Sequence, residues 1–329
     1  MNPMQAIAPP APGRRFQRRH NPPPFRVTPR VLAILEALHR YGLLTSQQIA
    51  RLDGGSQQKV LRILQLCFDH RLVDRPGAAQ LHPLSPYFDA RPLVYALSRK
   101  GAHLLADAGL EINVGIDRGT RNRRAVLIAH TITIAETLFS LHAACAAHGG
   151  LGLADHHDLL PVLPTTARER RKPFLIQTTV QPSDFPHLGR LLPAATTIGV
   201  EPDRVFSLTL PDRSGWTFGL ELDRGTERVI PKSLKGTSYL RKQLAYFDAW
   251  RGGGIIAEWG PAFRAFRILT VTTSDSRIAT MLDAQERVTR GAASGLFLYT
   301  TQKRLADEGA LGAIWTTAKH SRVSLLDRD

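Results

Sequence analysis

The chain has 329 residues, 43% of them hydrophobic, so it is long enough for about two domains with sizeable cores. Lys and Arg outnumber Asp and Glu by 43 to 28, and the net charge of +15 points to a polyanionic partner, most simply double-stranded DNA. Two cysteines exclude a disulfide scaffold, and the lack of a secretory leader or a roughly 20-residue apolar span favours the cytoplasm and no membrane. A high-GC genome, in which arginine is common, is the other explanation of the charge.

The first 27 residues (1–27) form a Pro- and Arg-rich arm that we expect to be disordered. The arm has no acidic residue, so its arginines are suited to following phosphates or entering a minor groove. A solvated tail that only aids solubility is the alternative. The DNA-binding candidates of the arm are Arg14, Arg15, Arg18 and Arg19.

The segment 28–112 has the element order of a winged helix-turn-helix domain: three helices, two strands and a last helix. Thr28-Pro29 is a signal that starts the first helix, and Thr45 starts a second helix over 46–52 that buries Leu52. The later elements are expected at about 57–70 for the third helix, 72–75 and 94–97 for the strands with a wing at 76–93 between them, and about 99–108 for the last helix.

The third helix follows a short glycine turn, as the recognition helix of this motif does. Its apolar spacing turns Leu61 and Cys67 inward and leaves Gln and basic side chains outward. Gln can read adenine and Arg can read guanine or phosphate in a major groove, whereas a protein-binding face is the alternative. The outward residues are Gln57, Gln58, Lys59, Arg62 and Gln65.

A basic linker over 113–125 leads to a second domain over 126–329. This domain starts with a long apolar helix that ends near Ala147 and carries, at about 150–200, an insertion predicted to be irregular. Strands then alternate with helices, which predicts a mixed α/β sheet. The expected elements are a helix at 237–250, a strand at 266–273, a helix at 276–290 and strands at 296–300 and 313–317.

Two alternating runs around a turn at 211–215 predict a β-hairpin. The apolar faces of the two strands coincide only if the numbers of each pair of opposite residues have an even sum. A turn centred near residue 212 makes this sum about 424. Asp203 then lies opposite Glu221, with Asp223 two residues further along the same face. Clustered carboxylates repel one another unless a cation compensates, and Mg²⁺ held by Asp203 and Glu221 would do so. The basic residues available for neutralisation instead are Arg204, Arg224 and Lys235.

Several short motifs match a known family: Thr28-Pro29 to Leu38, Tyr41 to Ala50, Ala129-His130, Pro202-Asp203 and Glu221 to Glu227. Over about residues 28–275 the chain resembles the replication-relaxation family of bacterial plasmids and other mobile elements. The resemblance implies a DNA-linked role in replication, relaxation, transfer or their control. It also implies replication or relaxosome proteins, or a second copy of the chain, as partners.

The second domain also resembles the restriction-endonuclease-like fold and its PD-(D/E)XK motif. The resemblance implies Pro202-Asp203 as the PD pair, Glu221 as the second acid and Glu136 as an extra acid. The lysine of the motif orients or activates the attacking water, but its position is Asp223 here. Lys235 or Lys242 from the next helix would have to replace it. The implied fold class is α+β / α/β, a winged helix-turn-helix followed by an endonuclease-like mixed α/β domain.

Three functions remain open. The first is a DNA-binding protein of a mobile element, and the second is a Mg²⁺-dependent DNA nuclease. The third is a winged-helix transcription regulator, for which no ligand motif is present. The catalytic candidates of the nuclease are Asp203, Glu221, Asp223 and Lys235, of which Asp203 and Glu221 would hold the metal.

Overall fold

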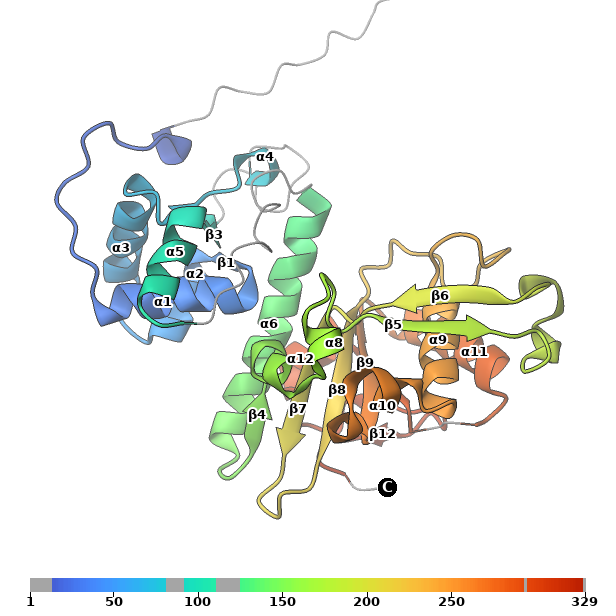
Figure 1. Ribbon diagram of the computed structural model, residues 1–329. Coiled ribbons are helices and arrows are strands. Elements are labelled where there is room, and N and C mark those ends of the chain that lie inside the picture. Colours follow the sequence, from blue (N-terminus) through green and yellow to red (C-terminus); the bar gives the residue numbers. More distant parts are fainter. Residues whose placement is uncertain (1–13, 81–91, 111–124, 293–294, 328–329) are drawn as a thin grey trace, which may run out of the picture. The chain divides into compact units, whose positions relative to one another are not determined.

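The computed structural model describes residues 14–80, 92–110, 125–292 and 295–327 (Figure 1). These residues belong to two compact units, Met1–Glu136 and Thr137–Asp329, which divide within the long helix α6 (Ala125–Ala147). Each unit combines helices with strands, so the chain is mixed α/β. Most of the predicted linker and most of the predicted wing lie outside the described residues.

The first unit has the helices that its sequence predicts. Thr28 and Thr45 cap two of them with their hydroxyl oxygens, and Thr45 does so in a capping box. Gly54 ends the second with a φ of 66°, a backbone conformation that glycine adopts without strain. The helices are α1 (Pro29–Tyr41), α2 (Ser46–Asp53), α3 (Gln57–Asp69), α4 (Gly77–Gln80) and α5 (Arg99–Asp107).

Three short strands accompany these helices. The central strand β3 (Val94–Leu97) is antiparallel to β1 (Leu43–Thr45) and to β2 (Val73–Asp74). The predicted strands at 72–75 and 94–97 are thus confirmed, whereas β1 has no counterpart among the predicted elements. Ile128 and Ile132 from the first half of α6 pack with this sheet in one apolar cluster.

Two predicted core residues of the first unit are exposed. The side chains of Leu52 and Leu61 retain 44% and 40% of their accessible surface, so the prediction that they lie inward is wrong. Ile49 and Val60, their neighbours on the two helices, are fully buried. The apolar stripe of each helix is therefore narrower than the sequence suggests. Cys67 is buried, as predicted.

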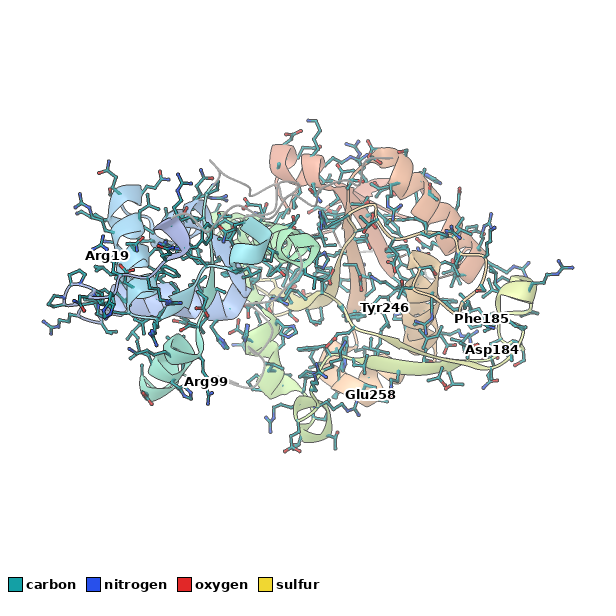
Figure 2. The ribbon with its side chains drawn as sticks, turned by 90° about the horizontal axis from the view of Figure 1, so that it is seen from above. Arg19, Arg99, Asp184, Phe185, Tyr246 and Glu258 are labelled. Atoms are coloured by element: carbon teal, nitrogen blue, oxygen red, sulfur yellow. The ribbon has the colours of Figure 1, made fainter. Side chains whose placement is uncertain are left out.

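Arm residues between 14 and 27, which the sequence analysis expects to be disordered, contact the first unit in the structure. Arg18 forms an ion pair with Asp74 at 2.5 Å, and its guanidinium lies 4.4 Å from the centre of the Phe68 ring. Arg19, labelled in Figure 2, lies 3.6 Å from Asp69. Asp69 and Asp74 are buried acids, and arginines of the arm supply a positive charge to each of them.

The second unit is built on a seven-stranded sheet with the order β12-β11-β10-β9-β8-β7-β4. β8 and β9 are parallel, as are β9 and β10, and the other neighbouring pairs are antiparallel. The predicted alternation of strands and helices is confirmed, with bounds that shift by at most two residues. The strands are β4 (Gly152–Ala154), β7 (Arg204–Thr209), β8 (Gly215–Leu222), β9 (Phe266–Thr272), β10 (Phe297–Thr301), β11 (Trp315–Thr316) and β12 (Arg322–Val323).

The predicted hairpin register is confirmed. Arg204 pairs with Leu220 and Phe206 with Phe218, so the paired numbers sum to 424. Phe206 and Phe218 stack on one face of the sheet, with ring centres 5.2 Å apart. The opposite face carries Glu221 and is covered by two helices. These are α9 (Tyr239–Arg251) and α11 (Asp275–Thr289), which share a core cluster with β9 and β10.

The prediction that 150–200 is irregular is wrong. Its first strand, β4, joins the main sheet, and β5 pairs with β6 in a separate hairpin that packs on α9. These strands are short, and β5 buries only Ile176 and Val180, so the sequence shows no period of two. The remaining elements are α7 (His156–Leu159), η3 (Leu160–Val162), α8 (Thr165–Arg168), β5 (Ile176–Val180), η4 (Pro186–Leu191), β6 (Thr196–Val200), α10 (Gly254–Trp259), η5 (Pro261–Phe263) and α12 (Gln302–Glu308).

One helix in the described part of the chain has the length and apolar character of a membrane span. It is Leu127–Ala147 within α6, and 56% of its most apolar window is buried inside the protein. A core helix of a soluble protein passes the same test, and Ile128 and Ile132 pack into the core of the first unit. The burial of α6 thus agrees with the prediction of a soluble chain.

Candidate active site

Asp203 and Glu221 meet at one end of the β7–β8 hairpin. Asp203 immediately precedes β7, and Glu221 is the second-last residue of β8. The Asp203 carboxylate accepts a hydrogen bond from the Leu222 amide at 2.8 Å, which fixes it beside the β8 backbone. The hairpin register therefore places these two carboxylates next to each other, as the sequence predicts.

A cation reaches this pair from helix α9. The Lys242 ammonium lies 2.9 Å from one oxygen of Glu221 and 3.5 Å from a carboxylate oxygen of Glu227. Ser238 caps α9, so Lys242 lies in the first turn of the helix. Tyr246, one turn later on the same face and labelled in Figure 2, donates a hydrogen bond to the other Glu221 oxygen at 2.5 Å.

Burial and charge set the protonation of this group. Burial raises the pKa of Glu221, and Asp203 raises it further, while Lys242 counteracts both. Burial disfavours the charged form of Lys242, but the carboxylates of Glu221 and Glu227 outweigh it and raise the pKa of the ammonium. Burial, reinforced by Glu221, raises the pKa of Tyr246 well above its usual value, so this hydroxyl remains a donor.

Asp223 does not join this pair. Its carboxylate forms a two-pronged ion pair with Arg277 of α11, at 2.5 and 2.7 Å, and also accepts a hydrogen bond from Thr272 at 2.6 Å. Arg277 donates in addition to the Glu227 carbonyl. The prediction that three carboxylates converge is therefore wrong. Glu221 pairs with Lys242 of α9, whereas Asp223, which directly follows β8, pairs with Arg277 of α11.

The other sequence-predicted acid and lysine lie elsewhere. Lys235 is exposed in the loop before α9. Glu136 belongs to the first unit, where its carboxylate accepts hydrogen bonds from Gln48 at 3.0 Å and Arg51 at 2.7 Å. The interpretation of Glu136 as an extra acid beside Asp203 therefore has no support in the fold.

The predicted DNA-binding residues of the first unit divide into two groups. Gln57, Gln58, Lys59 and Arg62 are exposed on α3, and Arg15 is exposed in the arm. Gln65 is instead held within the unit, where it donates to Asp69 and accepts from Arg75. Arg18 and Arg19 are engaged by Asp74 and Asp69, and Arg14 begins the short helix η1 (Arg14–Phe16).

Asp203 and Glu221 supply carboxylate oxygens, the type of ligand that Mg²⁺ prefers. Among the described residues, no group of three or more His, Cys, Asp and Glu side chains is arranged to hold a metal ion. Mg²⁺ commonly takes only one or two protein carboxylates and completes its shell with waters and substrate phosphate. Each carboxylate oxygen has two lone pairs, so the bonds to Leu222, Tyr246 and Lys242 leave acceptor sites.

Lys242 is one of the two lysines that the sequence analysis named as replacements for the motif lysine, whereas Tyr246 was not predicted to belong to the site. The signal for Tyr246 is its i, i+4 spacing from Lys242, which puts both side chains on one helix face. Behind them, Tyr239 pairs with Thr270, and Gln243 donates to Tyr299 at 2.8 Å. These hydrogen bonds satisfy the hydroxyls of Tyr239 and Thr270 and the Gln243 amide nitrogen, and they hold α9 against the sheet.

A comparison with family models matches residues 35–257 to the replication-relaxation family. The match covers more than half of the chain and includes α2, α3, the β7–β8 hairpin and α9. No curated protein and no solved structure matches the chain.

Proposed function

Because the chain belongs to the replication-relaxation family, which links it to replication or relaxation of mobile elements, we propose that it is a DNA-binding protein whose second unit hydrolyses phosphodiester bonds. One observation carries the hydrolytic part: Lys242 places an ammonium beside Glu221 and Asp203. The cation that the motif requires is thus supplied from the helix, although Asp223 occupies its position in the strand.

The element order supports this proposal. When the elements α7 to β6, which lie between β4 and β7, are left out, the order α6, β4, β7, β8, α9 and β9 is helix, three antiparallel strands, helix and a strand parallel to β8. The core of the endonuclease-like fold that the second domain resembles also runs helix, three strands, helix and strand. The two acids stand at the start of the second strand and the end of the third, as the motif requires.

Each residue has a role in the proposed reaction. Asp203 and Glu221 would hold Mg²⁺, which supplies Lewis-acid polarisation of the scissile phosphate. Lys242 donates hydrogen bonds to the negative charge that develops on the phosphate and helps to orient the attacking water. Tyr246 fixes the Glu221 carboxylate, so that it faces Lys242 and Asp203 in one orientation.

Nicking of supercoiled plasmid in Mg²⁺ tests the hydrolytic proposal. We expect Asp203→Asn and Lys242→Met each to lower the rate at least a hundredfold, the scale of one lost electrostatic contact to a transition state. Lys235→Met is the matched control, because this exposed lysine lies seven residues away, and it should cleave at the wild-type rate. Variants are compared only where their melting curves match the wild type.

Two outcomes would contradict the hydrolytic part. Cleavage that survives Asp203→Asn shows a contaminating nuclease or another site. If the wild-type protein cleaves no supercoiled, linear or single-stranded DNA, the hydrolytic part is refuted. The chain is then a DNA-binding protein without cleavage activity, as expected of a transcription regulator.

DNA binding by the first unit rests on the exposed polar face of α3. The order α1, α2, α3, β2, β3 supports a winged helix-turn-helix, in which α3 would enter the major groove. Gel shifts with Lys59→Ala plus Arg62→Ala should show weaker binding and a smaller salt dependence, by about 0.9 in the log–log slope per lost phosphate contact. Arg99→Ala plus Lys100→Ala removes two exposed cations from α5 and is the matched control. Equal affinity for the two variants would refute the assignment of α3.

A further inference from the structure

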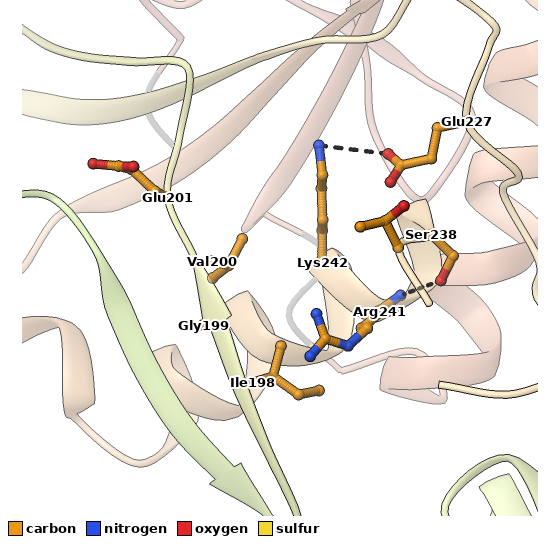
Figure 3. Close-up of a pocket in the computed structure, with 9 residues that line it drawn as sticks. Ile198, Gly199, Val200, Glu201, Glu227, Ser238, Arg241 and Lys242 are labelled. Carbon is orange, nitrogen blue, oxygen red and sulfur yellow. Dashed lines mark hydrogen bonds and ion pairs between the residues drawn. The ribbon is translucent and has the colours of Figure 1, made fainter. Parts of the chain in front are cut away.

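A pocket of about 120 Å³ lies between β6 and the start of α9 (Figure 3). Ile198 and Val200 of β6 form its apolar wall, and Ser238, Arg241 and Lys242 of α9 line the other side. Lys242 also belongs to the candidate active site, so the pocket opens beside the acids of that site. Its volume is many times the ~10–15 Å³ needed for a single water.

Arg241 is the unsatisfied group of this pocket. Its Nε atom is buried and has no hydrogen-bond partner, although a buried guanidinium N–H ordinarily finds an acceptor. The carboxylates of the pocket are engaged by lysines: Glu227 by Lys242 at 3.5 Å and Glu201 by Lys172 at 2.8 Å. A hydrogen-bond acceptor of a ligand would therefore satisfy the Nε–H of Arg241, and an anionic oxygen forms the strongest such bond.

The basic segment 168–172 adds positive charge at the edge of the pocket. Lys172 contacts Glu201, which lines the pocket, so this segment lies at its edge. Arg168 and Arg171 are exposed on the same segment. A strand that leaves the active site past Lys242 would thus meet Arg241 and then this basic surface, which a chain of phosphates requires.

We propose that this pocket binds a backbone phosphate of the DNA strand next to the phosphodiester at the active site, with Arg241 as its hydrogen-bond donor. The inference rests on the proposed function and assigns the path of the substrate. Arg241 and Lys242 are consecutive residues, and they contact consecutive phosphates of one strand. Arg241 is a positioning residue, since it holds the strand and not the reacting atoms.

The test measures binding of the full chain to a fluorescein-labelled DNA duplex in EDTA, where no metal-dependent cleavage occurs. For Arg241→Gln we expect the slope of log affinity against log salt to fall by about 0.9, the value of one phosphate contact. Arg241→Lys keeps the charge and should keep the slope. Arg287→Gln removes an exposed arginine from α11 and should leave the slope of the wild type.

An unchanged slope in Arg241→Gln, or the same fall in Arg287→Gln, overturns the inference. A melting-temperature rise with inorganic phosphate alone that Arg241→Gln abolishes, without any change in DNA binding, also overturns it, because the pocket then takes free phosphate. The binding assay does not depend on cleavage. A failed nicking assay with a lowered slope refutes the hydrolytic proposal alone, and normal nicking with an unchanged slope refutes the inference alone.

Discussion

The Asp223–Arg277 ion pair offers a direct test of how the acids of β8 divide their roles. Asp223 is the residue at the position of the motif lysine, and the structure binds it to α11 and not to Glu221. Replacing Arg277 by Met removes the guanidinium and leaves the Asp223 charge in place. The side chain of Asp223 is only 5% exposed, so that charge then lies buried without its counter-ion.

Breaking one partner of a buried ion pair costs about 3–5 kcal/mol. Thr272 and the Gly225 amide still donate to Asp223 after the change, so we expect the lower end, about 3 kcal/mol. For a unit of this size each kcal/mol lowers the melting temperature by about 2–4 °C, so Arg277→Met should melt about 6–12 °C lower. Asp223→Asn should lose less, because its amide can still accept from Thr272.

Calorimetry of the full chain measures this loss in the transition of the second unit. At a temperature where the variants are folded, plasmid nicking by Asp223→Asn should stay within a few-fold of the wild type, in contrast to Asp203→Asn. A melting temperature of Arg277→Met within 2 °C of the wild type would refute the energetic reasoning. Loss of nicking by a fully folded Asp223→Asn would return Asp223 to the chemistry.

Three further predictions follow from buried groups. Tyr246→Phe removes a hydrogen bond that lowers the pKa of Glu221. The acid limb of the pH–rate profile for nicking should therefore move to higher pH, and an acid limb at the same pH as in the wild type would contradict this. Burial holds the pKa of His156 well below 6.5, so stability should fall by about 1.4 kcal/mol per pH unit below pH 6.5, and urea titrations of His156→Phe should lack that slope. Burial raises the pKa of Cys67 to about 12, and burial also raises the pKa of Cys145. A thiol reagent should therefore label neither cysteine until denaturant is added, and rapid labelling of the native protein would refute their burial.

The hairpin is the part of the site that the sequence predicted best. Its register depends only on matching apolar faces across a short turn, and that local rule correctly paired Arg204 with Leu220. The same rule placed Asp203 beside Glu221. The alternation of side chains along a strand also put Asp223 on the same face as Asp203 and Glu221. This alternation does not show which helix covers each end of a strand. Asp223 and Arg277 are 54 residues apart, a separation that no local pattern spans.

The arm and the 150–200 region show a different limit. Composition predicted disorder for the arm because prolines and arginines cannot form a core, yet Arg18 and Arg19 find the acids Asp74 and Asp69. In the sequence these acids entered only the count of net charge, and nothing marked them as buried groups in need of a partner. In the 150–200 region, the strands of the β5–β6 hairpin bury too few residues to show alternation, although they build the wall of the pocket.

The Asp223–Arg277 and Glu221–Lys242 ion pairs differ in what they contribute to stability. A buried ion pair is poor evidence of a stabilising role, because apolar residues of similar size commonly serve stability as well or better. Asp223–Arg277 joins the end of β8 to α11 and to the Glu227 carbonyl, so its loss unties the loop after the strand. Glu221–Lys242 lies between elements already packed by an apolar core, and its carboxylate is 3% exposed. The double change Glu221→Leu plus Lys242→Leu should therefore keep or raise the melting temperature while it abolishes nicking. If the double variant melts several degrees lower, the pair is structural, and the strongest support for a hydrolytic site is lost.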